Sequence, residues 1–98
     1  MAQIELTDYP KRPFIQYRLD GEDNEYIVYQ TPRDGGVSVL NSVGAEVFLL
    51  SDGYHTVQDI VKKICEDYDV PGESQVQKDV LSMLAYLQKN GVILILKD

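Results

Sequence analysis

The stretch that decides the fold is Leu49-Leu50-Ser51-Asp52-Gly53-Tyr54-His55-Thr56-Val57-Gln58-Asp59-Ile60, which contains the only histidine of the chain. Asp52 and Gly53 are turn residues, and Gly53 stands where the end of a helix favours a left-handed conformation. Thr56 can accept a hydrogen bond from the backbone N–H of Asp59, whose carboxylate lies near the positive end of the helix dipole. The stretch therefore predicts a tight joint between two helices.

A helix is expected on each side of this joint, and a third helix follows. Asn41 is a good N-cap for a first helix that runs to about Leu50. The second helix begins at Thr56, and its expected buried positions are Val57, Ile60, Val61, Ile64 and Tyr68. A break over residues 69–73 follows, and the S-x-x-Q spacing of Ser74 and Gln77 predicts a capping box that opens the third helix. The expected core positions of the third helix are Val76, Val80, Met83, Leu84 and Leu87.

Strand patterns precede and follow the helices. Residues 14–19, 26–30 and 37–40 are rich in β-branched and aromatic residues and are separated by turn residues, which predicts a three-stranded antiparallel sheet. Residues 92–96, Val-Ile-Leu-Ile-Leu, predict a short terminal strand. Residues 1–13 contain two prolines and are expected to form an extended arm, so that the domain proper covers 14–98. The fold class is α+β.

The composition fits one small folded domain. The chain has 98 residues, 44% of them hydrophobic, and no apolar run long enough for a transmembrane helix. Its first residues have neither the cationic start nor the apolar stretch of a secretory signal. We therefore expect a soluble, cytoplasmic protein that is not embedded in a membrane.

Residues of the opening stretch also raise the question of catalysis. A nucleophilic site of Ser51, Asp52 and His55 would need the three side chains to converge in a pocket with oxyanion donors, which neighbours in a turn rarely do. Cys65 is the only cysteine, so no multi-cysteine metal site can form. No phosphate-binding glycine loop follows a strand. We expect no enzyme activity, no catalytic residue, no metal and no cofactor.

Two segments together resemble a known family. Residues 38–60 run from a strand that ends in Leu40-Asn41 through a helix to Asp52-Gly53-x-x-Thr56-x-x-x-Ile60. Residues 79–91 read D-V-x-x-x-L-x-x-L-x-x-x-G. In order and spacing these segments are similar to the PqqD family, and the likeness covers roughly residues 13 to 96.

The resemblance implies a fold and a function. PqqD-like domains are RiPP recognition elements with a winged-helix-turn-helix-like fold, in which a three-stranded antiparallel sheet is followed by three helices. They bind the leader segment of a ribosomally synthesised precursor peptide and present it to a modifying enzyme. In pyrroloquinoline quinone assembly that enzyme is a radical S-adenosylmethionine protein, and in relatives it is another tailoring enzyme.

The resemblance also implies where the leader binds. In the family the leader adds as a strand to the third strand of the sheet, in a groove walled by the third helix. Here that strand is Val37, Ser38, Val39 and Leu40. One flank of the third helix carries Gln77, Leu81, Leu84 and Gln88 next to the core residue Val80, and the other carries Asp79, Ser82 and Tyr86. We favour the first flank because Leu81 is an apolar residue away from the core stripe.

Two other functions compete with leader binding. In a winged-helix DNA-binding regulator the third helix would enter the major groove, but Lys78 and Lys89 are its only basic residues. The chain has 16 acidic and 9 basic residues and a net charge of -7, which repels a phosphate backbone. The remaining alternative is a general protein-interaction module that uses the same edge strand or the apolar tail at 92–96. The sheet, the modifying enzyme or a second copy of the chain in a homodimer would cover this tail.

Overall fold

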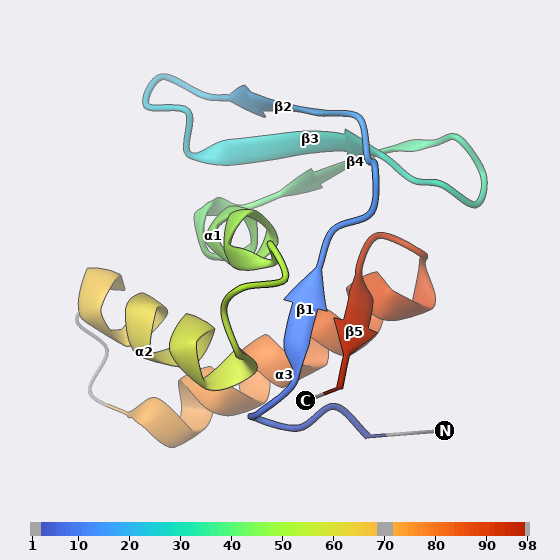
Figure 1. The fold of residues 1–98 in the computed structure, drawn as a ribbon. Helices are drawn as coiled ribbons and strands as arrows, with labels where there is room; N and C mark the ends of the chain where they lie inside the picture. Colours follow the sequence, from blue (N-terminus) through green and yellow to red (C-terminus); the bar gives the residue numbers. More distant parts are fainter. Residues whose placement is uncertain (1–2, 69–71, 98) are drawn as a thin grey trace.

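The computed structural model describes residues 3–68 and 72–97 and consists of a three-stranded sheet, three helices and a two-stranded sheet (Figure 1). In chain order the elements are β1 Tyr9–Lys11, β2 Tyr17–Asp20, β3 Tyr26–Gln30, β4 Val37–Leu40, α1 Ser42–Leu50, α2 Val57–Tyr68, α3 Glu73–Lys89 and β5 Leu94–Leu96. The expected α+β class, with a three-stranded antiparallel sheet, three helices and a short terminal strand, is confirmed. The predicted break over residues 69–73 lies partly outside the described residues, which resume at Gly72.

One phenylalanine joins the three-stranded sheet to the helices. The sheet has the order β2-β3-β4, and Ile27 and Tyr29 of β3 are buried on its inner face. Phe48 of α1, fully buried, stacks on Tyr29 at 5.9 Å between ring centroids and meets Tyr17 edge-on at 5.0 Å. The guanidinium of Arg12 lies 5.2 Å from the centre of the Phe48 ring. Aromatic packing of this kind stabilises a contact by more than its buried area alone.

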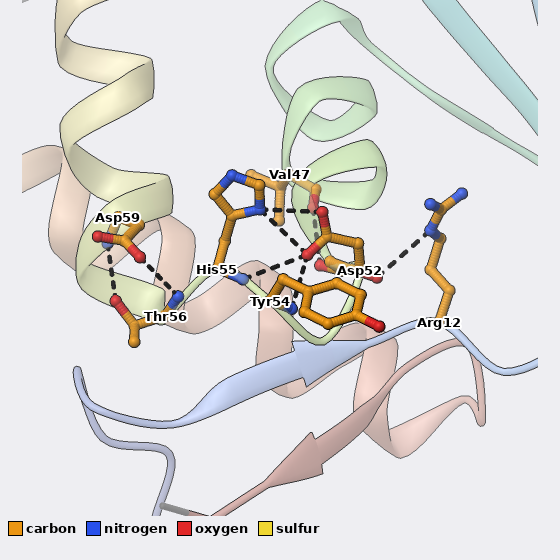
Figure 2. A network of polar contacts seen from close by, with 8 residues as sticks. Arg12, Val47, Asp52, Tyr54, His55, Thr56 and Asp59 are labelled. Atoms are coloured by element: carbon orange, nitrogen blue, oxygen red, sulfur yellow. Dashed lines mark hydrogen bonds and ion pairs between the residues drawn. The ribbon is translucent and has the colours of Figure 1, made fainter.

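The joint between α1 and α2 forms as the sequence predicts (Figure 2). Asp52 accepts hydrogen bonds from the backbone N–H of Tyr54 at 2.8 Å and of His55 at 3.2 Å, and Gly53 adopts a φ of +85°. Thr56 and Asp59 cap α2 reciprocally: Asp59 N–H donates to the Thr56 hydroxyl at 3.1 Å, and Thr56 N–H donates to the Asp59 carboxylate at 3.0 Å. This pair satisfies two N–H groups that the first turn of a helix leaves free.

The prediction for the start of α3 is wrong. The helix begins at Glu73, so Ser74 lies inside its first turn and cannot cap it. Gly72 is the N-cap and makes no side-chain capping bond. The side chain of Glu73 instead accepts a hydrogen bond from Gln58 Nε2 of α2 at 3.1 Å. Two expected core positions also differ, since Tyr68 is 40% exposed and Met83 is half-buried.

The N-terminal segment lies across the joint and pairs with the C-terminal strand. Four backbone hydrogen bonds hold it there: Arg12 N–H to Ser51 O, Gly53 N–H to Pro10 O, Val57 N–H to Asp8 O and Gln58 N–H to Leu6 O. β1 pairs antiparallel with β5, so the first residues of the chain cover one side of the apolar tail. Ile95 of β5 is half-buried, whereas Leu94 and Leu96 remain 52% and 41% exposed.

A buried ion pair locks the same segment. Asp8 is 2% exposed and accepts from Lys97 Nζ at 2.7 Å and from the backbone N–H of Glu5 at 2.8 Å. Burial raises the pKa of the Asp8 carboxyl, but these hydrogen bonds and the Lys97 charge outweigh it and hold the pKa below its ordinary value.

The capping box of α2 gives a first prediction. Replacing Thr56 by Ala should lower the free energy of unfolding by about 1 kcal/mol, because the N–H of Asp59 loses its acceptor. Thr56→Ser should retain most of that stability. The matched control is Ser74→Ala, which should change stability by less than about 0.5 kcal/mol because Ser74 caps nothing. Urea unfolding measures all three, and an equal loss for Ser74→Ala would contradict this account of the helix starts.

Two carboxyl groups, Glu46 of α1 and Asp67 of α2, lie close enough for each to shift the pKa of the other. Burial, together with hydrogen bonding and charge from the neighbouring Asp67, raises the pKa of Glu46 to about 7. The same hydrogen bond from Glu46 lowers the pKa of Asp67, which also pairs with Lys63 at 3.6 Å. Glu46 therefore stays protonated in the folded chain at pH values where it is ionised in the unfolded chain.

This pair gives the second prediction. Between pH 5 and pH 7 the folded state binds more protons than the unfolded state, so the free energy of unfolding should fall as the pH rises. Glu46→Gln should flatten this part of the curve, because the amide does not ionise. Urea unfolding of both proteins at several pH values gives the comparison. Parallel curves would show that Glu46 does not titrate in this range.

Candidate peptide-binding site

β4 is an edge strand of the three-stranded sheet, and its backbone groups on one side face no strand in the described part of the chain. In antiparallel pairs, residues bonded to one neighbour alternate with residues that face the other way. Thr31 N–H donates to Gly36 O at 2.8 Å, which places the facing pair Tyr29 and Ser38 among the bonded pairs. The backbone N–H and C=O groups of Val37 and Val39 therefore point away from β3.

A bond on the other side of β3 supports this alternation. Gln30 N–H donates to Gln16 O at 3.1 Å, toward β2, and Gln30 is the residue opposite Val37. Gln30 thus turns its backbone groups to β2 and not to β4. The outward direction of the Val37 backbone groups follows from two independent hydrogen bonds.

Side chains of β4 alternate between the two faces of the sheet. Val37 and Val39 are 72% and 63% exposed and lie on the outer face. Ser38 and Leu40 are half-buried and lie on the inner face, opposite Tyr29 and Ile27. A strand added beside β4 would therefore place every second side chain on the inner face, where the helices lie.

The end of β4, α1 and α3 meet at one corner on that inner face. A Cβ atom on Gly44 of α1 would lie 3.3 Å from Cβ of Leu40 and 3.2 Å from Cε of Met83. Tyr86, one turn further along α3, approaches Tyr29. Burial raises the pKa of the Tyr29 hydroxyl, the hydrogen bond with Ser38 opposes this rise, and Tyr86 adds to it. Met83 and Tyr86 therefore mark the side of α3 that faces the sheet.

A hollow of about 240 Å³ opens beside this corner, between the three helices. Its lining residues are Val43, Val47, Ile64, Tyr68, Gln75, Val76, Asp79, Val80 and Met83. Most of these are aliphatic, and among the described residues Asp79 is the lining residue that carries a formal charge. The hollow can accept an apolar side chain, with a carboxylate in its wall.

The structure places the predicted residues of α3 in four different settings. Val80, 1% exposed, forms part of the wall of the 240 Å³ hollow. Leu84 is fully buried in the core and offers no surface to a ligand. Leu81 and Gln88 line another hollow, together with Gln3 and Arg33, and Gln77 is half-buried and lines neither hollow.

The flank of α3 that faces the sheet is thus the one that the sequence analysis did not favour. Met83, assigned there to the core stripe, contacts the corner with Leu40, and Asp79 and Tyr86 belong to the same flank. Helical spacing shows which residues share a flank but does not show which flank faces the sheet. The sequence did contain one indication of this flank: Asp79, Met83 and Tyr86 combine a charged, an apolar and an aromatic side chain at helical spacing.

The polar cluster at the joint has a structural role. The Ser51 hydroxyl is buried and donates to the Val47 carbonyl at 2.7 Å, so it is not available as a nucleophile. His55 is partly buried, and its Nδ1 lies 2.9 Å from the Asp52 carboxylate (Figure 2). Burial raises the pKa of Asp52, but the N–H groups of Tyr54 and His55 outweigh it and the pKa is lowered. Each of these side chains holds the turn.

Residues 3–68 and 72–97 contain neither a metal-binding cluster nor a membrane-spanning helix. No three His, Cys, Asp or Glu side chains gather there in a way that would hold a metal ion. None of the helices described is both long and apolar enough to cross a membrane.

Comparison with known proteins agrees with the fold. The family model described as "Coenzyme PQQ synthesis protein D (PqqD)" matches residues 25–93. A search of the curated proteins gave no match. Among solved structures, the chain is similar to the PqqD truncation of Methylobacterium extorquens PqqCD, whose title describes a functional and stand-alone RiPP recognition element. The TM-score is 0.72 with 27% sequence identity, over 93% of this chain and 94% of that one.

The matched model spans more than two thirds of the chain and includes β4, α1 and α3, the elements that form the site. The chain belongs to the PqqD family.

Proposed function

We propose that this protein binds the leader segment of a ribosomally synthesised precursor peptide as an additional strand beside β4 and presents it to a modifying enzyme. The observation that carries the proposal is the free backbone edge of Val37 and Val39, which lies next to the corner formed by Leu40 and Met83. Family membership supports a role in precursor recognition. The modifying enzyme is a radical S-adenosylmethionine protein or another tailoring enzyme.

The free edge provides affinity that does not depend on the leader sequence. Val37 and Val39 present two N–H and two C=O groups, and each hydrogen bond to a peptide contributes roughly 0.5–1.5 kcal/mol net. The peptide loses conformational entropy when it is ordered as a strand, which offsets much of this gain. We therefore expect a dissociation constant of about 0.1–10 μM, suited to reversible capture.

Selectivity comes from the inner face. Alternate side chains of the added strand would point toward α1 and α3, where Met83 and the 240 Å³ hollow offer an apolar surface. Asp79 in the wall of that hollow favours a leader with a basic residue beside an apolar one. Leaders with an acidic residue at that position should bind more weakly.

The charge distribution disfavours the DNA-binding alternative. The hairpin of β2 and β3, which would serve as the wing of a winged helix, carries Asp20 at the end of β2 and Glu22, Asp23 and Glu25 in its turn. α3 presents Asp79 in the wall of the hollow between the three helices. A wing of this charge next to a phosphate backbone would be repelled and not attracted.

The proposal predicts opposite outcomes for two substitutions of one residue. Val39→Pro removes an outward N–H but no bond of the β3–β4 ladder, so the fold should persist while leader affinity falls at least about tenfold. Val39→Ala keeps the N–H and changes only an exposed side chain on the outer face, so affinity should stay within about threefold. Calorimetric titration with the leader half of the precursor peptide, on variants shown to be folded by circular dichroism, measures both.

The same titration tests which flank of α3 the leader contacts. Tyr86→Ala should weaken leader binding, whereas Gln88→Ala, an exposed change on the opposite flank, should leave it unaltered. Wild-type affinity in Val39→Pro would exclude strand addition to β4. Weakening by Gln88→Ala alone would place the leader on the other flank of α3.

A further inference from the structure

A second hollow lies on the flank of α3 that carries Leu81 and Gln88. Its volume is about 650 Å³, and it is lined by Gln3, Ile4, Arg33, Leu81, Ala85, Gln88 and Lys89. These residues come from the N-terminal segment, the turn between β3 and β4, and the last turns of α3, which lie on one side of the molecule in Figure 1. The hollow shares no lining residue with the 240 Å³ hollow. It is therefore a separate surface from the proposed leader groove.

Apolar residues form the floor of this hollow and cations stand at its rim. Ile4 is 9% exposed, Leu81 is half-buried, and Ala85 lies one turn further along the same face of α3. Arg33 and Lys89 are exposed, and neither forms an ion pair within the described residues. Among residues 3–68 and 72–97, no acidic residue lines the hollow.

This local charge is opposite to that of the whole chain. The protein has a net charge of -7, with 16 acidic and 9 basic residues, yet two cations and no acid line this hollow. Lys78 lies on the same face of α3, three residues before Leu81, whereas Asp79 lines the other hollow. A positive patch on an acidic protein attracts a negatively charged partner to that patch and to few other places.

The walls of the hollow are fixed by contacts elsewhere. Lys97 Nζ donates to the Gln3 carbonyl at 3.0 Å and to the buried Asp8 carboxylate at 2.7 Å, which anchors the N-terminal wall. The wall at the turn is stabilised by Thr31 N–H, which donates to Gly36 O. A ligand would therefore meet a surface that is already formed, and little ordering would oppose its binding.

We propose that this hollow docks an acidic segment of a partner protein, in which an aliphatic side chain stands between carboxylates. The side chain would cover Ile4, Leu81 and Ala85, and the carboxylates would pair with Arg33 and Lys89. Because the hollow shares no lining residue with β4 or with the 240 Å³ hollow, both sites can be occupied at once. The inference does not depend on leader binding.

The test uses a short capped peptide of glutamate and aspartate around one leucine, titrated into the complete ¹⁵N-labelled chain. Amide shifts should concentrate at Ile4, Arg33 and residues 81–89 and should shrink as salt is added. A peptide with lysine in place of every acid should cause no such shifts. Absence of shifts at this hollow with millimolar acidic peptide would overturn the proposal.

Two double variants with the same change in net charge distinguish binding at the hollow from a general effect of the protein's charge. Arg33→Glu with Lys89→Glu should weaken binding of the acidic peptide about tenfold or more. Arg18→Glu with Lys62→Glu makes the same change in net charge away from the hollow and should weaken binding by less than about threefold. If both double variants weakened peptide binding equally, the affinity would depend only on the net charge of the protein, and the proposed site would be contradicted.

The same peptide also distinguishes this surface from the leader groove. The Val39→Pro variant, in which the β4 edge is impaired, should bind the acidic peptide as the wild type does. If Val39→Pro abolished the shifts at residues 81–89, the two surfaces would be one site and the proposal would fail.

Discussion

The arrangement of the molecule depends on the burial of one aromatic ring. Phe48 of α1 lies between Tyr29 and Tyr17 of the sheet, under the guanidinium of Arg12, and is fully inaccessible to solvent. Loss of a buried phenylalanine typically costs about 3–5 kcal/mol, a large part of the stability of a domain of this size. Because α1 carries this contact, the sheet is held to the helices mainly through its inner face. The outer edge of β4 is left without a strand.

The position of α1 depends in turn on the joint at residues 51–56 and on the segment that crosses it. Backbone bonds from residues 6–12 to the joint and to the start of α2 tie the N-terminus to the middle of the chain. The β1–β5 pair and the Asp8–Lys97 ion pair tie it to the C-terminus as well. These contacts fix three helices behind the sheet, so the groove beside β4 has walls that exist before a ligand arrives.

Local chemistry made much of this fold predictable. The N-cap at Asn41, the left-handed Gly53 and the reciprocal cap of Thr56 and Asp59 each depend on neighbours in sequence, and each formed as expected. The capping box at Ser74 failed because α3 begins one residue earlier, at Glu73. The pairing of β1 with β5 joins residues more than eighty positions apart, and no local pattern signals it.

The site was less predictable than the fold for a similar reason. Strand periodicity identified β4 and its exposed valines, but the flank of α3 that faces β4 depends on how the helix crosses the domain. Leu81, the apolar residue that suggested the opposite flank, lines a different hollow with Arg33 and Lys89. A single apolar residue off the core stripe does not by itself identify a binding surface, since such residues are common on protein surfaces.

The most direct test of the account is amide hydrogen exchange at Val37–Leu40, followed by NMR with and without saturating leader peptide. Ser38 and Leu40 bond to β3 and should exchange slowly in both states, whereas Val37 and Val39 should exchange quickly in the free protein. Leader binding should slow Val37 and Val39 by about tenfold or more, because an added strand accepts their hydrogen bonds. Tight binding that leaves these two amides in fast exchange would contradict strand addition at β4.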